Sequence, residues 1–338
     1  MTGRCRGWPG VLLLLALLAG AVLLRLLVGR SVDPDGSIGP AWGWPGDVVL
    51  ELRGSSILAA SIAGAALGLS GLAFQNLLRN PLASPWVLGV SSGAGFGVMV
   101  GAWLATVPGA GALAGFLLLG AGLPGAALGA IAAIAVVWWL ARRLGGFDPV
   151  SLVLCGVVVN STFAAGTMLL QHLSPNGVRG DFTTWMMGRI PELLPGWLAA
   201  LGVLSIVVVG AIAWRWHATL DAAGLDDDEA ISVGVPLVGL RRGLMILGGG
   251  LATLAVVVVG PIAFVGLLAP HAARLLVGAS HRQVVPGAAL SGAVVLVVAD
   301  LVRQILDLGG GRVPVGILTA LVGGPVFLWL LIRRRGML

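Results

Sequence analysis

The stretch GPIAFVGLLAPHAARLLVG, residues 260–278, combines a strongly apolar run with two prolines, and it decides the fold class. In a soluble helix, Pro261 and Pro270 would each remove a backbone donor and clash with the preceding turn. A membrane bundle tolerates such prolines because neighbouring helices satisfy the freed carbonyl groups. The stretch therefore predicts a broken or kinked pair of helical pieces inside a polytopic membrane protein. His271 and Arg274, three residues apart, are expected on one face.

The composition of the whole chain also indicates a membrane protein. Hydrophobic residues make up 58% of the 338 residues, charged residues make up only 10%, and the mean hydropathy is +1.02. A soluble domain of this composition would expose too much apolar surface. Because a helix crosses the bilayer with about 20 apolar residues, the chain has room for about ten spans. Its 54 glycines favour close packing of helices in lipid.

The basic residues lie between the apolar runs, so the net charge of +6 is interpreted as a topology signal. No nucleic-acid partner is expected. All twenty basic residues are arginine, so the chain contains no G-x-x-x-x-G-K-[ST] phosphate loop. If ATP drives this protein, a separate subunit must hydrolyse it. The chain itself is therefore expected to be no enzyme and to bind no cofactor.

Apolar runs that end in arginine, tryptophan or turn residues predict an all-α fold with about ten membrane-spanning helices. The predicted spans are approximately 11–29, 56–78, 91–107, 112–140, 150–171, 197–216, 240–259, 262–279, 286–306 and 314–332. The first run could instead be a cleaved signal peptide, but its length and the lack of an A-x-A-like site favour a retained helix. Arg25 and Arg30 would then snorkel outward. Residues 31–55 are expected to form an external loop, and residues 172–196 a polar segment with a short surface helix.

Ten spans would place both termini on the same side of the membrane. On this assignment thirteen arginines lie on the terminal side and seven on the opposite side. This excess predicts that both termini are cytoplasmic. No soluble domain is evident, so residues 1–338 are expected to form a single membrane domain.

Three pieces of sequence together resemble the permease subunits of ABC importers for iron-siderophores, haem and vitamin B12. They are residues 260–278, GAALGLSGLAFQNLLRNPLASPWVLGVSSGAG at 64–95, and VPVGILTALVGGPVFLWLL at 313–331. With the spacing between them, the match covers nearly the whole chain beyond the first helix. The signature positions of the first piece are Gly260, Pro261, Phe264, Gly266, Pro270, His271 and Arg274.

The resemblance implies a permease of the bacterial plasma (inner) membrane with several partners. These are a second permease copy or a paralogue, two cytoplasmic ABC ATPase subunits that hold ATP and Mg, and an extracytoplasmic substrate-binding protein. The cargo would be a metal chelate. Permeases for ferric siderophores, haem and cobalamin share these motifs, so the sequence does not separate the three cargoes, nor a homodimer from a heterodimer. Ferric siderophore is preferred only on its frequency in the family.

The acidic segment 218–235 is predicted to form a short cytoplasmic helix. Carboxylates at a helix N-terminus stabilise the helix, and Pro236 would end it; a solvated loop is the alternative. The resemblance implies that this segment couples the permease to the ATPase. The candidate coupling residues are Asp226, Asp227, Asp228, Glu229, Ser232 and Gly234.

Arg53 and Arg303 match arginines that, in the resembled family, form salt bridges with glutamates of the binding protein. The chain departs from the family pattern R-x-P-R, because Arg53 begins the sequence R-G-S-S. Arg312 replaces an acidic residue of the family, which makes it a further docking candidate. The alternative for Arg303 is a local ion pair with Asp300 or Asp307. For Asp300, an ionisable group at membrane depth, this structural pair is preferred.

The cytoplasmic gate is also implied by the resemblance. Asn80 and Leu82 match the inner-gate loop of the family, and Pro149 and Val150 match a second constriction. Irregular backbone near proline is acceptable at membrane depth only where it lines a cavity. His271 lacks the cluster of ligands that a metal site needs, so no metal site is expected. Pro270, His271 and Arg274 are interpreted as structural residues near the inner mouth, with direct contact to the substrate as the alternative.

Two other classes of protein are considered. An ion-coupled secondary transporter would need ionisable residues near the membrane midplane, and the chain has almost none. An intramembrane enzyme would need a Ser/His or paired-Asp arrangement at depth. The four histidines are predicted mostly at the interfaces.

Overall fold

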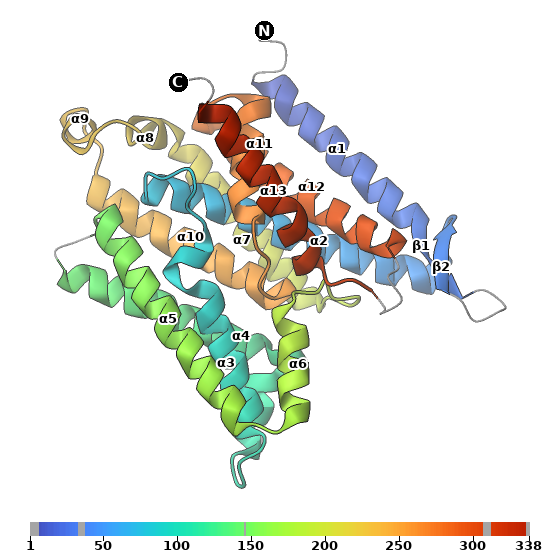
Figure 1. The fold of residues 1–338 in the computed structure, drawn as a ribbon. Coiled ribbons are helices and arrows are strands. Elements are labelled where there is room, and N and C mark those ends of the chain that lie inside the picture. Colours follow the sequence, from blue (N-terminus) through green and yellow to red (C-terminus); the bar gives the residue numbers. More distant parts are fainter. Residues whose placement is uncertain (1–6, 33–37, 145–146, 307–311, 336–338) are drawn as a thin grey trace.

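The computed structural model describes residues 7–32, 38–144, 147–306 and 312–335, and nearly all of its regular structure is helical (Figure 1). In chain order the elements are α1 (Trp8–Leu27), β1 (Val28–Val32), β2 (Ile38–Trp42), α2 (Asp47–Leu77), the 3-10 turn η1 (Pro85–Leu88), α3 (Val90–Leu104), α4 (Gly111–Arg143), α5 (Pro149–Leu173), α6 (Asn176–Met186), α7 (Gly196–Arg215), α8 (His217–Ala222), α9 (Asp227–Ser232), α10 (Leu237–Val259), α11 (Val265–Val277), α12 (His281–Ile305) and α13 (Val315–Arg335). The predicted all-α fold is confirmed, and a helix occupies each predicted span.

Seven of these helices are long and apolar enough to cross a membrane: α1, α2, residues 122–143 of α4, α5, α7, α10 and α12. The other apolar helices of the described chain are shorter. With 13 residues, α11 is about 20 Å long, against a hydrocarbon thickness of about 30 Å. The predicted span 262–279 is therefore wrong in its bounds, because residues 260–264 leave the helical conformation.

The central helix of the bundle is α2, which packs along α10, α11 and α12. Its glycines make this possible. A Cβ atom on Gly64 would lie 2.3 Å from the carbonyl oxygen of Gly292 in α12, and one on Gly71 would lie 1.7 Å from that of Gly266 in α11. No side chain fits at these crossings, so the helices approach backbone to backbone, as small residues allow in membrane bundles.

The described residues of the segment predicted as an external loop, 31–32 and 38–55, are more ordered than expected. Strands β1 and β2 form an antiparallel hairpin in which Val28 pairs with Trp42. Helix α2 then begins at Asp47, whose carboxylate lies in the first turn, where it favours helix formation. The start of α12 was also predicted too late, because the helix begins at His281 and includes Pro286.

Different elements lie at the two ends of the bundle. The start of α1, the end of α13 and the short helices α8 and α9 lie together at one end, at the top of Figure 1. We call this the inner end. The amide of Gly7, before α1, donates to the carbonyl of Val277, at the end of α11, with a donor–acceptor distance of 2.8 Å. The hairpin, the start of α2 and the end of α12 lie at the opposite, outer end.

The crossing of α2 and α11 should be intolerant of any side chain at residue 71. Replacing Gly71 with alanine is expected to lower the free energy of unfolding by about 3 kcal/mol, because the methyl group would overlap the backbone of Gly266. The measurement is thermal unfolding of the detergent-solubilised protein, followed by tryptophan fluorescence. Gly20→Ala is the matched control, since this helical glycine has open space around it and alanine favours helix by about 1 kcal/mol. Equal stability of the two variants would contradict the packing described here.

Candidate functional site

The signature stretch forms a break between α10 and α11 in the interior of the bundle. Gly260 has φ +77° and Phe264 has φ +66°, so both lie in the left-handed region, which is unusual for a phenylalanine. Two of the carbonyl oxygens at the break accept hydrogen bonds from other elements. The amide of Arg189 donates to the carbonyl of Val259 at 2.8 Å, and the indole Nε1 of Trp86 donates to the carbonyl of Ile262 at 3.2 Å. The predicted break is confirmed.

The break is also where the connection after α6 approaches the core. Gly188, with φ +71°, faces Gly260, and a Cβ atom on Gly260 would lie 3.0 Å from the carbonyl oxygen of Trp185. A Cβ atom on Gly316, in α13, would lie 2.3 Å from the carbonyl oxygen of Met187. The signature stretch therefore joins α10, α11, α13 and the end of α6 at one place.

The polar residues of α11 contact α2. The guanidinium of Arg274 donates from Nη1 to the side-chain oxygen of Gln75 at 2.6 Å, and the amide of Gln75 donates to the carbonyl of Leu267 at 3.3 Å. Pro270 is buried inside α11. These contacts support the structural interpretation of Arg274, and they make Gln75 part of a polar contact between α2 and α11.

The acidic segment forms two short helices, α8 and α9, where one was predicted. Asp226 precedes α9, and the first turn contains Asp227, Asp228 and Glu229. The side chain of Asp226 makes no capping hydrogen bond, so its stabilising effect is limited to its charge near the helix start. Gly234, with φ +87°, follows the helix and allows the chain to turn towards α10. Ser232 lies at the end of α9, and its hydroxyl donates to the carbonyl of Glu229 at 2.7 Å.

The residues predicted to form the gate lie in two short connections. Asn80 accepts a hydrogen bond from the amide of Leu82 at its side-chain oxygen, at 2.9 Å, in a tight turn after α2. The side chain of Leu82 is 43% exposed. Pro149 begins α5, where the carboxylate of Asp148 accepts from the amide of Ser151, and Val150 is 67% exposed. Exposed apolar side chains at both positions are compatible with a constriction, which stays a prediction.

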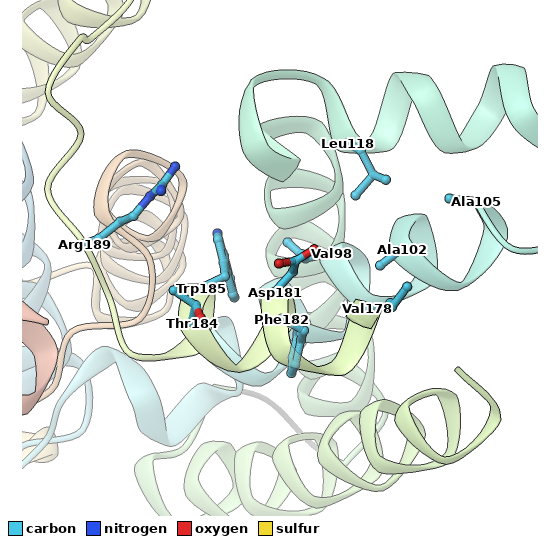
Figure 2. A pocket seen from close by; sticks show the side chains of 10 residues that line it. All are labelled: Val98, Ala102, Ala105, Leu118, Val178, Asp181, Phe182, Thr184, Trp185 and Arg189. Atoms are coloured by element: carbon cyan, nitrogen blue, oxygen red, sulfur yellow. The ribbon is translucent and has the colours of Figure 1, made fainter. Parts of the chain in front are cut away.

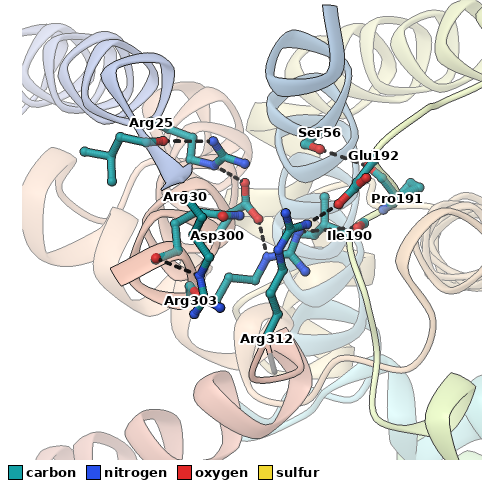
Figure 3. A network of polar contacts seen from close by, with 11 residues as sticks. Arg25, Arg30, Ser56, Ile190, Pro191, Glu192, Asp300, Arg303 and Arg312 are labelled. Carbon is teal, nitrogen blue, oxygen red and sulfur yellow. Dashed lines mark hydrogen bonds and ion pairs between the residues drawn. The ribbon is translucent and has the colours of Figure 1, made fainter. Parts of the chain in front are cut away.

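A buried ionic network holds the outer end together (Figure 3). Both carboxylate oxygens of Asp300 are engaged: Nε of Arg25 lies 2.5 Å from Oδ2, and Nε of Arg303 lies 2.5 Å from Oδ1. Asp300 is fully buried, and Arg25 and Arg303 are only 4% and 5% exposed. The predicted pair of Asp300 with Arg303 is confirmed. Asp307, the other predicted partner of Arg303, lies outside the described residues.

Two predictions for arginines need correction. Arg25 does not snorkel outward, because Asp300 offers it a carboxylate inside the bundle. Arg303 was a docking candidate for a binding protein, but its burial leaves no surface for a partner to contact in this conformation. Sequence reasoning missed the pair of Arg25 with Asp300. Its signal was a charged residue inside the first apolar run, and such residues need a partner at membrane depth.

The other outer arginines are more accessible. Arg53 is half-buried and donates from Nη1 to the carbonyl of Leu26, while Arg30 donates from Nε to the carbonyl of Gln304 at 3.1 Å. Arg312 forms an ion pair with Glu192 in which both side chains are exposed. Arg53 and Arg312 therefore keep charged surface at the outer end, whereas Arg303 does not.

One cavity was not predicted from the sequence. It has a volume of about 400 Å3 and lies between α3, α4 and α6, with Asp181, Trp185 and Arg189 in its wall (Figure 2). The rings of Phe182 and Trp185 stack there with centroids 6.2 Å apart. Within the described residues, no cluster of three or more His, Cys, Asp or Glu side chains is arranged to hold a metal ion.

The network at the outer end should be sensitive to loss of its carboxylate. Asp300→Asn is expected to lower the free energy of unfolding by about 3–5 kcal/mol, because it leaves two buried arginines without a counter-charge. The matched control is Glu192→Gln, which removes an exposed pair with Arg312 and should cost at most about 1 kcal/mol. Thermal unfolding of both variants tests this. An Asp300→Asn protein as stable as Glu192→Gln would refute a buried charged network.

Comparison with known proteins gives consistent results over the whole length. Residues 10–333 match the FecCD transport family. The hemin transport system permease protein HmuU of Yersinia pestis is 35% identical over 289 residues, covering 85% of this chain and 83% of that protein. The iron(3+)-hydroxamate import system permease protein FhuB of Salmonella typhimurium is 34% identical over 94% of this chain. The match spans only 44% of FhuB.

A solved structure confirms the architecture. It is described as an inward-facing conformation of a metal-chelate type ABC transporter, and it superposes with a TM-score of 0.79 at 28% sequence identity. The superposition covers 96% of this chain and 98% of that chain. The likeness therefore extends over the complete arrangement of helices.

Proposed function

The chain belongs to the FecCD transport family, and from this premise we propose that it forms the membrane passage of an ATP-driven importer for iron-siderophore chelates. It is a permease subunit of the type II importers that serve iron chelates, haem and vitamin B12, and a multi-pass protein of the bacterial plasma membrane. The observation that carries the proposal is a helical bundle that lacks a nucleotide-binding loop and carries short acidic helices at one end.

The proposed topology has ten crossings and cytoplasmic termini, in a single permease domain over residues 1–338. A helix occupies each predicted span, and the start of α1 and the end of α13 lie at the inner end. The thirteen arginines assigned to that side support its cytoplasmic placement. The broken, shorter α11 would cross together with the irregular residues 260–264, of which Ile262, Ala263 and Phe264 have donors to their carbonyl groups within the protein.

The inner surface of α8 and α9 is proposed to contact an ATPase subunit. Leu225, Ile231 and Val233 are exposed there, beside the exposed carboxylates of Asp228 and Glu229. A patch that mixes apolar and acidic side chains suits a groove with an apolar floor and basic rim. Two such subunits, each holding ATP and Mg, would serve a dimer of permeases, and this chain would bind no cofactor itself.

The passage is proposed to end in a gate at the inner end and to receive cargo at the outer end. Asn80, Leu82, Pro149 and Val150 would form the gate. Arg53 and Arg312 would contact acidic residues of the substrate-binding protein, since both keep exposed surface at the outer end.

Iron-siderophore chelate is the proposed cargo, with haem and cobalamin as alternatives. The related permeases are named for hydroxamate, enterobactin, dicitrate, hemin and vitamin B12 systems, so iron chelates are the commonest among them.

The proposed ATPase contact predicts an effect of charge reversal on α9. Replacing Asp228 and Glu229 with arginine should reduce recovery of the ATPase with tagged permease by about tenfold or more, because like charges would meet in the interface. Asp47→Arg, an equivalent reversal at the outer end, should leave recovery unchanged. Unchanged recovery for the α9 variant would contradict the assigned contact.

The cargo is tested by uptake in cells that lack this chain. Deletion should abolish energy-dependent uptake of a radioiron hydroxamate chelate, and expression of the chain should restore it. If only hemin or only cobalamin uptake depends on the chain, the siderophore assignment is wrong and the importer assignment stands.

A further inference from the structure

The carboxylate of Asp227 points into this chain rather than towards a partner. Nη1 of Arg79 lies 2.6 Å from its Oδ1 atom, and Nη2 of Arg241 lies 2.8 Å from Oδ1 and 3.0 Å from Oδ2. The neighbouring Asp228 is exposed and makes no side-chain bond within the described residues. Two adjacent acidic residues of α9 therefore have different surroundings.

Arg79 holds both short helices of the acidic segment at once. Besides its ion pair with Asp227, at the start of α9, it donates from Nη2 to the carbonyl of Ala223, which follows α8, at 3.1 Å. Arg79 has φ +46°, a left-handed conformation that costs free energy for a residue with a side chain. Strained backbone of this kind persists where surrounding contacts fix it. The amide of Asn80 donates to the carbonyl of Gln75 at 3.1 Å across this residue, and the two side-chain contacts of Arg79 add to it.

The far side of α8 is anchored to the bundle. The carboxylate of Asp221 accepts from the amide of His281 at 3.0 Å, and Nδ1 of the same histidine lies 2.6 Å from it. Nε2 of His281 lies 3.0 Å from the side-chain oxygen of Asn76, near the end of α2. If α9 moves, the contacts of Asp221 would hold α8 in place. The residue of the bundle that is displaced first would then be Arg79.

Arg79 directly precedes the turn that contains Asn80 and Leu82. The amide of Leu82 and the amide of Ala83 both donate to Asn80, to its side-chain oxygen and to its carbonyl, each at 2.9 Å. These two hydrogen bonds close the turn, so we expect the turn and Arg79 to move as one unit.

We propose that Arg79 is a positioning residue that transmits movement of α8 and α9 to the turn at Asn80 and Leu82. This inference rests on the proposed function, since it assumes that an ATPase moves α9. The ion pair is partly exposed on both sides, 27% for Arg79 and 46% for Asp227. Pairs of this kind add little to folding stability, so their loss should change the coupling between the two segments rather than the fold.

The experiment measures movement at Leu82 in the assembled importer, and so needs no knowledge of the cargo. Leu82→Cys is introduced after alanine replaces Cys5 and Cys155, and its rate of modification by a water-soluble maleimide is measured in liposomes. The rate is compared without nucleotide and with ATP and vanadate. Arg79→Gln and Asp227→Asn should each reduce the nucleotide-dependent change by about two- to fivefold, and Arg79→Gln should leave ATP hydrolysis and recovery of the ATPase unchanged.

Three further variants test whether the ion pair of Arg79 with Asp227 transmits movement or only stabilises the fold. Arg79→Lys keeps the charge and should restore a large part of the response. The double variant Arg79→Gln/Asp227→Asn should be no worse than either single variant, because all three break one link. Arg282→Gln removes an exposed arginine at the start of α12 and should leave the response at Leu82 intact. If Arg79→Gln destabilises the protein, Asp227→Asn carries the test alone.

The possible outcomes test the role of the Arg79–Asp227 ion pair and the proposed function separately. A full response at Leu82 in both Arg79→Gln and Asp227→Asn would overturn the link while leaving the importer intact. An equal loss in Arg282→Gln would also overturn it, because the effect would then follow the loss of any arginine at the inner end. Absence of any nucleotide response in the Leu82→Cys protein that keeps Arg79 and Asp227 would overturn the proposed function itself.

Discussion

The structure depends on satisfying the backbone groups that the break at residues 260–264 leaves without helical partners. No water is available in hydrocarbon, so each exposed carbonyl there would cost several kcal/mol. Two donors reach carbonyls at the break. The amide of Arg189, after α6, reaches the carbonyl of Val259, and the indole of Trp86, in η1, reaches that of Ile262. These elements must therefore meet at the break. Glycines lie in α2, in α11 and at residue 188, after α6, where the backbones approach too closely for side chains.

The two ends of the bundle are held by contacts of different strength. At the outer end, Asp300 and its two arginines are buried, and breaking this network leaves charges without solvent or partner. At the inner end, the ion pairs of Asp227 and Asp221 are partly exposed and can be exchanged for water at little cost. A fixed outer end and an adjustable inner end suit a permease that is moved from its cytoplasmic side.

Local patterns in the sequence predicted the helices, the break in the signature stretch and the pair of Asp300 with Arg303. Each depends on hydropathy or on residues within one turn of a helix. Contacts between distant segments were missed, because Arg25 and Asp300 are 275 residues apart and no periodicity relates them. The contact of Arg79 with Asp227 was missed for the same reason. The hairpin was missed because its strands carry glycines and a proline instead of an alternating pattern. Roles at Asn80, Leu82, Pro149 and Val150 came from family resemblance and stay predictions.

The central claim is that this chain is a passage without an energy source of its own. The most direct measurement is accumulation of a radioiron hydroxamate chelate, hemin or cobalamin by liposomes. Liposomes that contain the chain alone should accumulate none of the three under an imposed proton or sodium gradient. With the ATPase, ATP and the binding protein added, one of them should accumulate. Gradient-driven accumulation by the chain alone would contradict the account.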